Sequence, residues 1–323
     1  MPAISASAPG KIILFGEHAV VYGRPAIAVP VNQVKAKAFV TADPRGIPGT
    51  VRIIAPDIRL DSNLSELPEY HPLAWAVKEV LAALGISRPP ACTIRISSTI
   101  PIAAGLGSGA AVSIAILRSF STFLGHPLPE EQVSKLAYEV EKLHHGTPSG
   151  IDNTVITFNI PVYFVHKDRE QQVQQIEPIR VKKTFTIVIG DTGVSSPTAV
   201  AVNDVRRAWQ AETEHYESLF DSAGAIVDAA RQVIENGQSE NLGMLMDANH
   251  DILRKMGVSS PELDHLVKIA RTAGAMGAKL SGGGRGGNMI ALAPPEKAPA
   301  ITLALERAGA VRTLVTKVES NKG

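Results

Sequence analysis

Three ionisable side chains interrupt an otherwise apolar run near the start of the chain. They are Lys11, Glu17 and His18, and they lie within Ala8–Gly23, whose sequence is APGKIILFGEHAVVYG. Burial of such groups costs free energy unless they pair or bind a ligand. We therefore expect either a satisfied ion pair, such as Lys11 with a carboxylate, or a site for a charged ligand, and the two interpretations are compatible.

Two carboxylates, Glu141 and Asp152, form a second candidate group. A helix is expected over 128–146, so Glu141 lies near its end, and a turn rich in glycine and proline then brings Asp152 back toward it. Two carboxylates placed in this way can divide the work, one holding a metal ion and one accepting a proton. The adjacent His144 and His145 point in different directions on a helix, which favours solvated or capping roles over a shared metal ion.

A glycine-rich turn, Gly105–Gly109, lies between an expected strand and an apolar helix in PIAAGLGSGAAVSIAI, which runs from Pro101 to Ile116. Glycines leave backbone N–H groups uncovered, and a helix start carries partial positive charge, so a phosphate-like anion fits there. The turn lacks the lysine of a Walker A loop, and its third glycine has the wrong offset for a dinucleotide fingerprint. A close-packed turn without a ligand remains the alternative.

A second glycine cluster, Gly282–Gly287, follows Lys279 and Ser281. Such a run suits neither a helix nor the interior of a regular strand. Two glycine-rich loops on one chain can line one phosphate tail from both sides. The alternative is a flexible surface hairpin, against which the apolar flanks of the cluster argue.

Composition limits the classes of protein to consider. The chain has 323 residues and a net charge of +1, which gives no electrostatic case for nucleic acid or an anionic membrane. No apolar run approaches the roughly 20 residues of a membrane span, and no signal-peptide pattern opens the chain. A single cysteine, Cys92, forms no internal disulfide and is expected to be a buried hydrophobe in a reducing compartment.

The elements that must position these residues follow from apolar periodicity and stop signals. Strands are expected at 11–15, 31–42, 50–55, 91–100, 184–193 and 311–319, and helices at 71–85, from the first glycine turn to about 124, and at 128–146, 198–218, 221–235, 239–256 and 260–273. The polar stretch after Val165 favours either a lobe boundary or a solvated hairpin.

Taken together, these segments resemble the GHMP kinase superfamily and, within it, the mevalonate kinases. The family pattern Ala-Pro-Gly-Lys followed by Gly-Glu-His-x-Val-Val-x-Gly stands at Ala8–Gly23. Three further family patterns stand at Pro101–Ala110, His145–Asp152 and Lys279–Gly287. Galactokinases have a Thr-Asp pattern after Gly-Glu-His, whereas this chain continues with Ala19.

The resemblance implies an α+β fold of two lobes. Residues 1–180 would form the N-terminal GHMP kinase lobe, like ribosomal protein S5 domain 2, and 181–323 a ferredoxin-like C-terminal lobe. The implied activity is ATP-dependent phosphorylation of the C5 hydroxyl of (R)-mevalonate to 5-phosphomevalonate, with Mg²⁺ as cofactor. We expect a cytoplasmic homodimer with neither nucleic-acid nor membrane partners.

Site roles carry over position by position. Asp152 would be the base and Lys11 would neutralise charge beside it, while Glu141 would hold Mg²⁺. Ser108 either adds a metal ligand or leaves the metal to Glu141, phosphate oxygens and water. The residues implied for nucleotide binding are Pro101, Gly105, Leu106, Gly107, Ser108, Gly109, Ala110, Ser281, Gly282 and Gly283, and those for mevalonate are Glu17, His18 and Thr198.

The chain departs from the family pattern at four positions, which are Gly109 for serine, Gly283 for alanine, Arg285 for glycine and Asn288 for cysteine. These changes concern the metal shell and the nucleotide loop more than the reaction class. The alternatives left open are phosphomevalonate kinase or another small-alcohol kinase of the same superfamily, a catalytically dead relative, and a dinucleotide-binding oxidoreductase.

Overall fold

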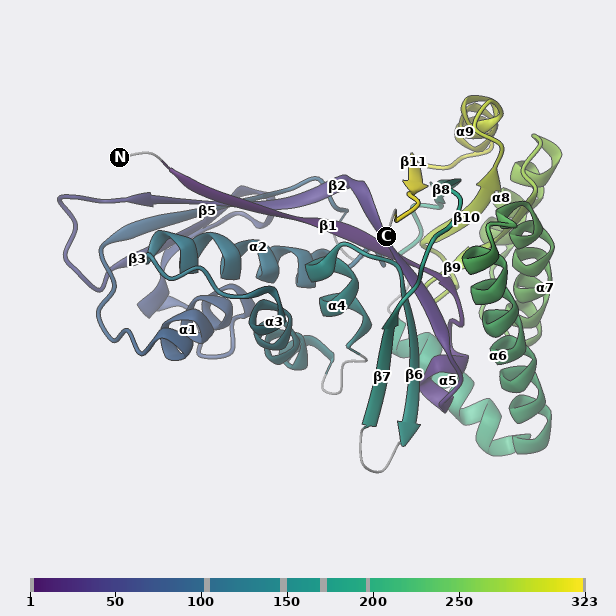
Figure 1. Cartoon of the computed structure of the whole chain (residues 1–323), viewed down its shortest axis with the longest axis horizontal. Coiled ribbons are helices and arrows are strands. Elements are labelled where there is room, and N and C mark those ends of the chain that lie inside the picture. Colours follow the sequence, from purple (N-terminus) through teal and green to yellow (C-terminus); the bar gives the residue numbers. More distant parts are fainter. Residues whose placement is uncertain (1–2, 102–104, 146–149, 169–172, 196–197, 322–323) are drawn as a thin grey trace. The chain divides into compact units, whose positions relative to one another are not determined.

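A computed structural model describes residues 3–101, 105–145, 150–168, 173–195 and 198–321 (Figure 1). The chain divides into two compact units. The first unit comprises Met1–Lys11, Val34–Ile102 and Leu106–Asn159. The second comprises Ile12–Gln33, Ala103–Gly105 and Ile160–Gly323.

The first unit contains a mixed sheet. Its strands pair in the order β4-β3-β5-β2, and β1 also pairs with β2. The β3–β5 pair is parallel, whereas β2–β5 and β3–β4 are antiparallel. The strand bounds are Ile4–Phe15 for β1, Ala26–Ala42 for β2, Val51–Ala55 for β3, Leu60–Asn63 for β4 and Cys92–Ser98 for β5.

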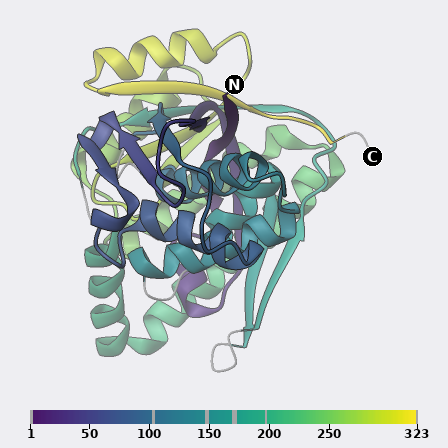
Figure 2. The same cartoon turned by 90° about the vertical axis from the view of Figure 1, so that its left-hand side faces the viewer.

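Helices gather on one side of this sheet (Figures 1 and 2). They are α1 (Pro72–Leu84), α2 (Ser108–Phe123), α3 (Glu130–His145) and α4 (Ile151–Phe158). Helix α2 contacts α1, α3 and α4 as well as β5, which its small side chains permit. The buried helix expected after the first glycine turn is therefore confirmed.

The polar stretch after Val165 belongs to a hairpin in the second unit. Strands β6 (Val162–Asp168) and β7 (Val173–Pro178) pair antiparallel, and β6 also pairs with the start of β2. Of the two alternatives for this stretch, the hairpin is confirmed. Its connecting residues lie outside the described part of the chain.

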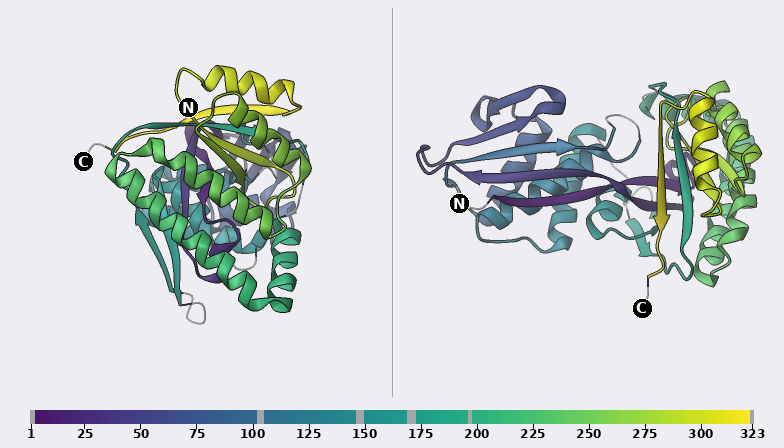
Figure 3. Two further views of the ribbon diagram at one scale, coloured as in Figure 1. Left: turned by 90° about the vertical axis from the view of Figure 1, so that its right-hand side faces the viewer. Right: turned by 90° about the horizontal axis from the view of Figure 1, so that it is seen from above.

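The rest of the second unit is built on an antiparallel sheet in the order β11-β8-β10-β9. Helices α7 and α8 pack on β9, and α9 packs on β8 and β11, so helices cover one face of the sheet (Figure 3). The bounds are Phe185–Asp191 for β8, Gly277–Ser281 for β9, Asn288–Ala293 for β10, Arg312–Val318 for β11, Thr198–Ala211 for α5, Thr213–Asn236 for α6, Leu242–Lys255 for α7, Pro261–Thr272 for α8 and Ala298–Arg307 for α9.

The expected break between two helices near residue 220 is wrong. Helix α5 ends at Ala211 and α6 runs without interruption through Phe220, which is fully buried and stacks on Tyr22 with ring centroids 4.1 Å apart. Phe220 is thus a buried residue in the interior of a continuous helix rather than at a break. Among the described helices, none combines the length and apolar character that crossing a bilayer requires.

Candidate active site

Lys11 and Asp152 form an ion pair in the first unit. Lys11 lies on β1 and Asp152 in the first turn of α4, and Lys11 Nζ is 2.9 Å from Asp152 Oδ1. Their side chains are 11% and 24% exposed. The local ion pair expected for Lys11 is confirmed, and one face of the pair remains open to solvent.

Glu141, on α3, belongs to the same cluster. Its side chain is buried. Burial raises the pKa of Glu141 to about 8, the charge of Asp152 adds to the rise, and Lys11 opposes it. As the sequence predicts, Asp152 returns close to Glu141, although residues 146–149 of the connecting turn and the side chains of His144 and His145 lie outside the described part.

A neighbour of Asp152 fixes the orientation of α4. The side-chain amide of Asn153 donates to the backbone oxygen of Ser134 at 3.1 Å and to its hydroxyl at 2.9 Å. Ser134 lies on α3, the helix that carries Glu141. These bonds therefore hold the two carboxylate-bearing helices together in one arrangement.

The first glycine turn contacts Lys11. Lys11 N donates to Leu106 O at 2.9 Å. Gly107 has φ +72°, and a Cβ there would lie 2.8 Å from Ile156 Cδ1 and 2.9 Å from Lys11 Cγ, so both conformation and space require glycine.

Helix α2 begins at Ser108, directly after the glycine turn. The N-cap residue Gly107 supplies no side-chain hydrogen bond to the first turn. Leu106 and Ala110 are buried, Gly105 and Gly109 are exposed, and Pro101 and Ser108 are half-buried. The start of α2 therefore offers a ligand backbone N–H groups and one hydroxyl, that of Ser108.

A second, deeper ion pair lies in the second unit. Lys279 Nζ donates to Glu17 Oε1 and also to Leu280 O at 2.7 Å, and the two side chains are 0% and 1% exposed. Among the described residues, no hydrogen-bond partner is assigned to the buried Glu17 Oε2. Burial raises the pKa of Glu17 and lowers that of Lys279, and their mutual attraction opposes both changes.

His18 adds another buried acceptor next to this ion pair. His18 Nε2 lies 2.9 Å from Gly283 O, and because a carbonyl only accepts, Nε2 carries the proton. His18 Nδ1 is then an acceptor, and it is buried with no partner in the part of the chain that the structure describes. Burial lowers the pKa of His18 to about 4, so the ring is neutral near pH 7.

Ser281 and Thr198, which the sequence also predicts as site residues, lie at the second glycine cluster. Ser281 Oγ donates to Ile13 O at 2.7 Å, which ties β9 to the end of β1. A Cβ on Gly283 would lie 2.9 Å from Thr198 Oγ1, so the loop contacts the exposed first residue of α5. Glu17, His18, Thr198 and the start of the glycine cluster are therefore neighbours.

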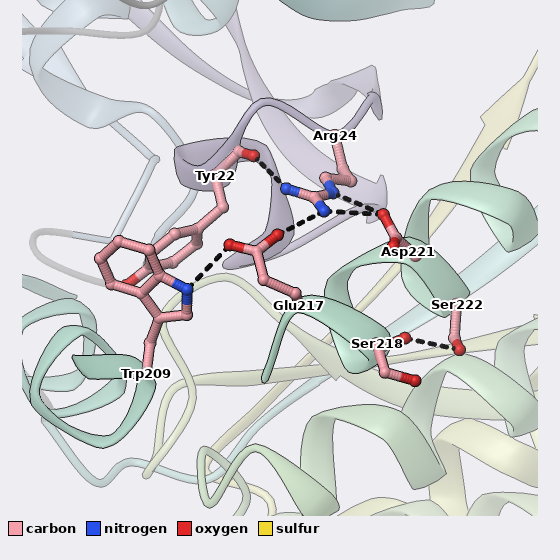
Figure 4. A network of polar contacts seen from close by, with 7 residues as sticks. All are labelled: Tyr22, Arg24, Trp209, Glu217, Ser218, Asp221 and Ser222. Atoms are coloured by element: carbon pink, nitrogen blue, oxygen red, sulfur yellow. Dashed lines mark hydrogen bonds and ion pairs between the residues drawn. The ribbon is translucent and has the colours of Figure 1, made fainter. Parts of the chain in front are cut away.

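Arg24 anchors the turn that follows His18 (Figure 4). The guanidinium donates to Asp221 at 2.7 and 3.0 Å, to Glu217 at 2.5 Å and to Tyr22 O at 2.7 Å. Trp209 Nε1 donates to the other oxygen of Glu217 at 2.8 Å. Sequence reasoning missed this network, and it missed the pairing of Lys279, because the partners lie far apart along the chain.

Comparison with known proteins places the chain in a family. The pattern described as "GHMP kinases N terminal domain" matches residues 72–159, and "GHMP kinases C terminal" matches residues 226–311. The mevalonate kinase of Thermococcus gammatolerans is 39% identical over 93% of both chains. The chain belongs to the mevalonate kinase family of GHMP kinases. The family's enzyme from Thermococcus sibiricus is 38% identical, with 98% of this chain and 96% of that one covered.

Solved structures agree with this assignment. The crystal structure of L. major mevalonate kinase in complex with R-mevalonate superposes with a TM-score of 0.85 at 31% identity. The match covers 99% of this chain and 97% of that chain. The two-lobe α+β fold expected from the sequence is thus that of the mevalonate kinase family.

The raised pKa of Glu141 makes stability depend on pH. Between about pH 4.5 and 8 the folded chain holds a proton that the unfolded chain has lost, so the free energy of unfolding falls as pH rises. Glu141→Gln removes this effect. The comparison is made without nucleotide or Mg²⁺. The melting temperature of Glu141→Gln minus that of the wild type should be larger at pH 8 than at pH 5, with about 2–4 °C for each kcal/mol gained in the free energy of unfolding.

Glu139→Gln, an exposed change on the same helix, is the matched control and should show no such pH-dependent gain. A melting-temperature difference between Glu141→Gln and wild type that stays constant from pH 5 to pH 8 would contradict the raised pKa.

Removal of Lys279 should leave Glu17 buried without its counter-charge. Lys279→Met is expected to lower the free energy of unfolding by roughly 3–5 kcal/mol, as for other broken buried pairs. The double change Glu17→Gln with Lys279→Met should recover part of this loss. Denaturant titration measures both, with the exposed Lys268→Met as control. If Lys279→Met is as stable as the wild type, loss of the counter-charge of Glu17 does not cost the folded state free energy, which would contradict this prediction.

Proposed function

We propose that this chain phosphorylates the C5 hydroxyl of (R)-mevalonate with ATP, giving 5-phosphomevalonate and ADP, a step of the mevalonate pathway of isoprenoid biosynthesis. The observation that carries the proposal is likeness over nearly the whole chain to a mevalonate kinase crystallised with R-mevalonate. The Lys11, Asp152 and Glu141 cluster gives that likeness a chemical basis, because all three ionisable groups lie together.

Asp152 is the proposed base. Its carboxylate accepts the proton of the C5 hydroxyl as that oxygen bonds to the γ-phosphorus and the bond from the γ-phosphorus to the β,γ-bridging oxygen breaks, so that ADP leaves. Lys11, 2.9 Å from Asp152, holds the carboxylate in place and supplies positive charge beside the transferring group. Charge neutralisation and positioning are the main protein contributions to phosphoryl transfer.

Mg²⁺ is the proposed cofactor, and Glu141 fits it. Glu141 is a buried carboxyl group close to Asp152, and carboxylate oxygens are ligands that Mg²⁺ accepts, while Ser108 adds a hydroxyl at the start of α2. Among the described residues, no three His, Cys, Asp or Glu side chains cluster to hold a metal alone. Mg²⁺ commonly keeps water and phosphate ligands, and when bound it would neutralise charge on the phosphates.

The remaining roles follow the two glycine-rich segments. We assign ATP phosphates to the backbone of the turn before α2 and to the start of the second cluster. In the turn before α2, Pro101, Leu106 and Ala110 shape the backbone and present no polar side chains. The assigned residues are Gly105, Gly107, Ser108, Gly109, Ser281, Gly282 and Gly283 for the nucleotide, and Glu17, His18 and Thr198 for mevalonate.

A phosphomevalonate kinase is the second candidate, and the electrostatics of the second unit disfavour it. Glu17 Oε2 and the neutral His18 Nδ1 are buried acceptors, which suit hydroxyl donors and not an additional phosphate. We further propose a cytoplasmic homodimer without a nucleic-acid partner, in keeping with a net charge of +1. The lobe boundary near residue 180 stays a prediction.

Coupled ADP release with mevalonate, 5-phosphomevalonate, homoserine and galactose tests the assignment. Mevalonate should support Mg²⁺-dependent ADP release, and the other three substrates should stay near background. A reaction containing excess chelator serves as the control for metal dependence. Comparable turnover of 5-phosphomevalonate would overturn the proposed substrate.

A further inference from the structure

Arg285 occupies a position in the second glycine cluster where the family pattern has glycine. Its backbone φ is +58°, in the left-handed region that residues with a Cβ seldom adopt. Gly284, Gly286 and Gly287 beside it also have positive φ, which glycine adopts without strain. The backbone strain of an arginine at this position must therefore be offset by contacts that a glycine cannot make.

The side chain of Arg285 makes such contacts with two other elements. Its guanidinium forms an ion pair with Asp204 of α5 through Nη1. Nε and Nη2 each lie 3.4 Å from Gly257 O, in the connection between α7 and α8. The backbone N of Arg285 donates to Val258 O at 2.8 Å. One residue therefore joins the glycine loop, α5 and the α7–α8 connection.

The elements joined by Arg285 carry groups assigned to mevalonate. Thr198 and Asp204 belong to the same 14-residue helix, so an anchor at Asp204 also restrains Thr198. A Cβ on Gly283 would lie 2.9 Å from Thr198 Oγ1, and Gly283 O accepts the bond from His18 Nε2 at 2.9 Å. A shift of α5 against the loop would thus change the spacing between Thr198 and His18.

Arg285 also acts on His18 electrostatically. Burial is the main cause of the lowered pKa of His18, and the positive charge of Arg285 adds to it. Arg285 and the carbonyl that orients the imidazole belong to the same loop.

We propose that Arg285 is a positioning residue for the alcohol substrate. Its ion pair with Asp204 fixes α5 against the glycine loop and so holds Thr198 and the Gly283–His18 pair in the arrangement that receives mevalonate. The inference rests on the proposed function and deepens it. It predicts that loss of Arg285 weakens mevalonate binding more than it slows phosphoryl transfer.

Steady-state kinetics of Arg285→Gly, Asp204→Asn and the double variant test this role. Each single change should raise KM for mevalonate by about 5- to 20-fold, with kcat and KM for ATP within about threefold. The double variant should match the singles, because both remove one ion pair. Arg285→Lys should recover part of the affinity.

Arg207 provides a matched control, since it also pairs with Asp204, at 3.0 Å, but its side chain is 76% exposed. Arg207→Gln should leave KM for mevalonate unchanged. Arg285→Gly restores the residue that tolerates positive φ, and thermal unfolding should show it near wild-type stability. Asp204→Asn leaves the loop backbone untouched and tests the same contact from the other side.

A KM for mevalonate within twofold of wild type in both Arg285→Gly and Asp204→Asn would overturn the inference, as would losses in kcat and kcat/KM that are equal. Failure of the proposed function gives a different result, because the wild-type chain itself would then release no ADP with mevalonate.

Discussion

An ammonium and a carboxylate that leave water lose hydration, and they regain much of that free energy only when they face each other. This constraint governs the arrangement around Lys11 and Asp152. The ion pair fixes the start of α4 against β1, and the glycine turn before α2 packs against the aliphatic part of the Lys11 side chain. Glu141 lies buried in the same cluster, where the charge of Asp152 adds to the rise of its pKa.

The second unit contains a more deeply buried ion pair. Glu17 and Lys279 are buried almost completely and pair with each other, and within the described part of the chain Glu17 Oε2 and His18 Nδ1 have no assigned hydrogen-bond partner. Under the proposed function, the hydroxyl groups of the substrate would donate to these acceptors. The first sequence motif and the second glycine cluster are therefore parts of one structure.

Local signals made much of this predictable. The charged residues in an apolar run indicated an ion pair for Lys11, and small apolar residues after Gly109 indicated a buried helix. Distant contacts were not predictable in the same way. Lys279 is separated from Glu17 by 262 positions, and Phe220, inside α6, stacks on the distant Tyr22. Patterns within a short window carry no information on such partners, whereas family resemblance identified the motifs that meet.

Lys11 and Asp152 are proposed to act as one unit in phosphoryl transfer. A double-mutant cycle on kcat with Lys11→Met, Asp152→Asn and their combination measures this directly. Each single change should lower kcat by roughly 10²–10⁴-fold, and the combination should be no worse than the more severe single. Losses that multiply in the double variant would contradict the account, because they would show two independent contributions.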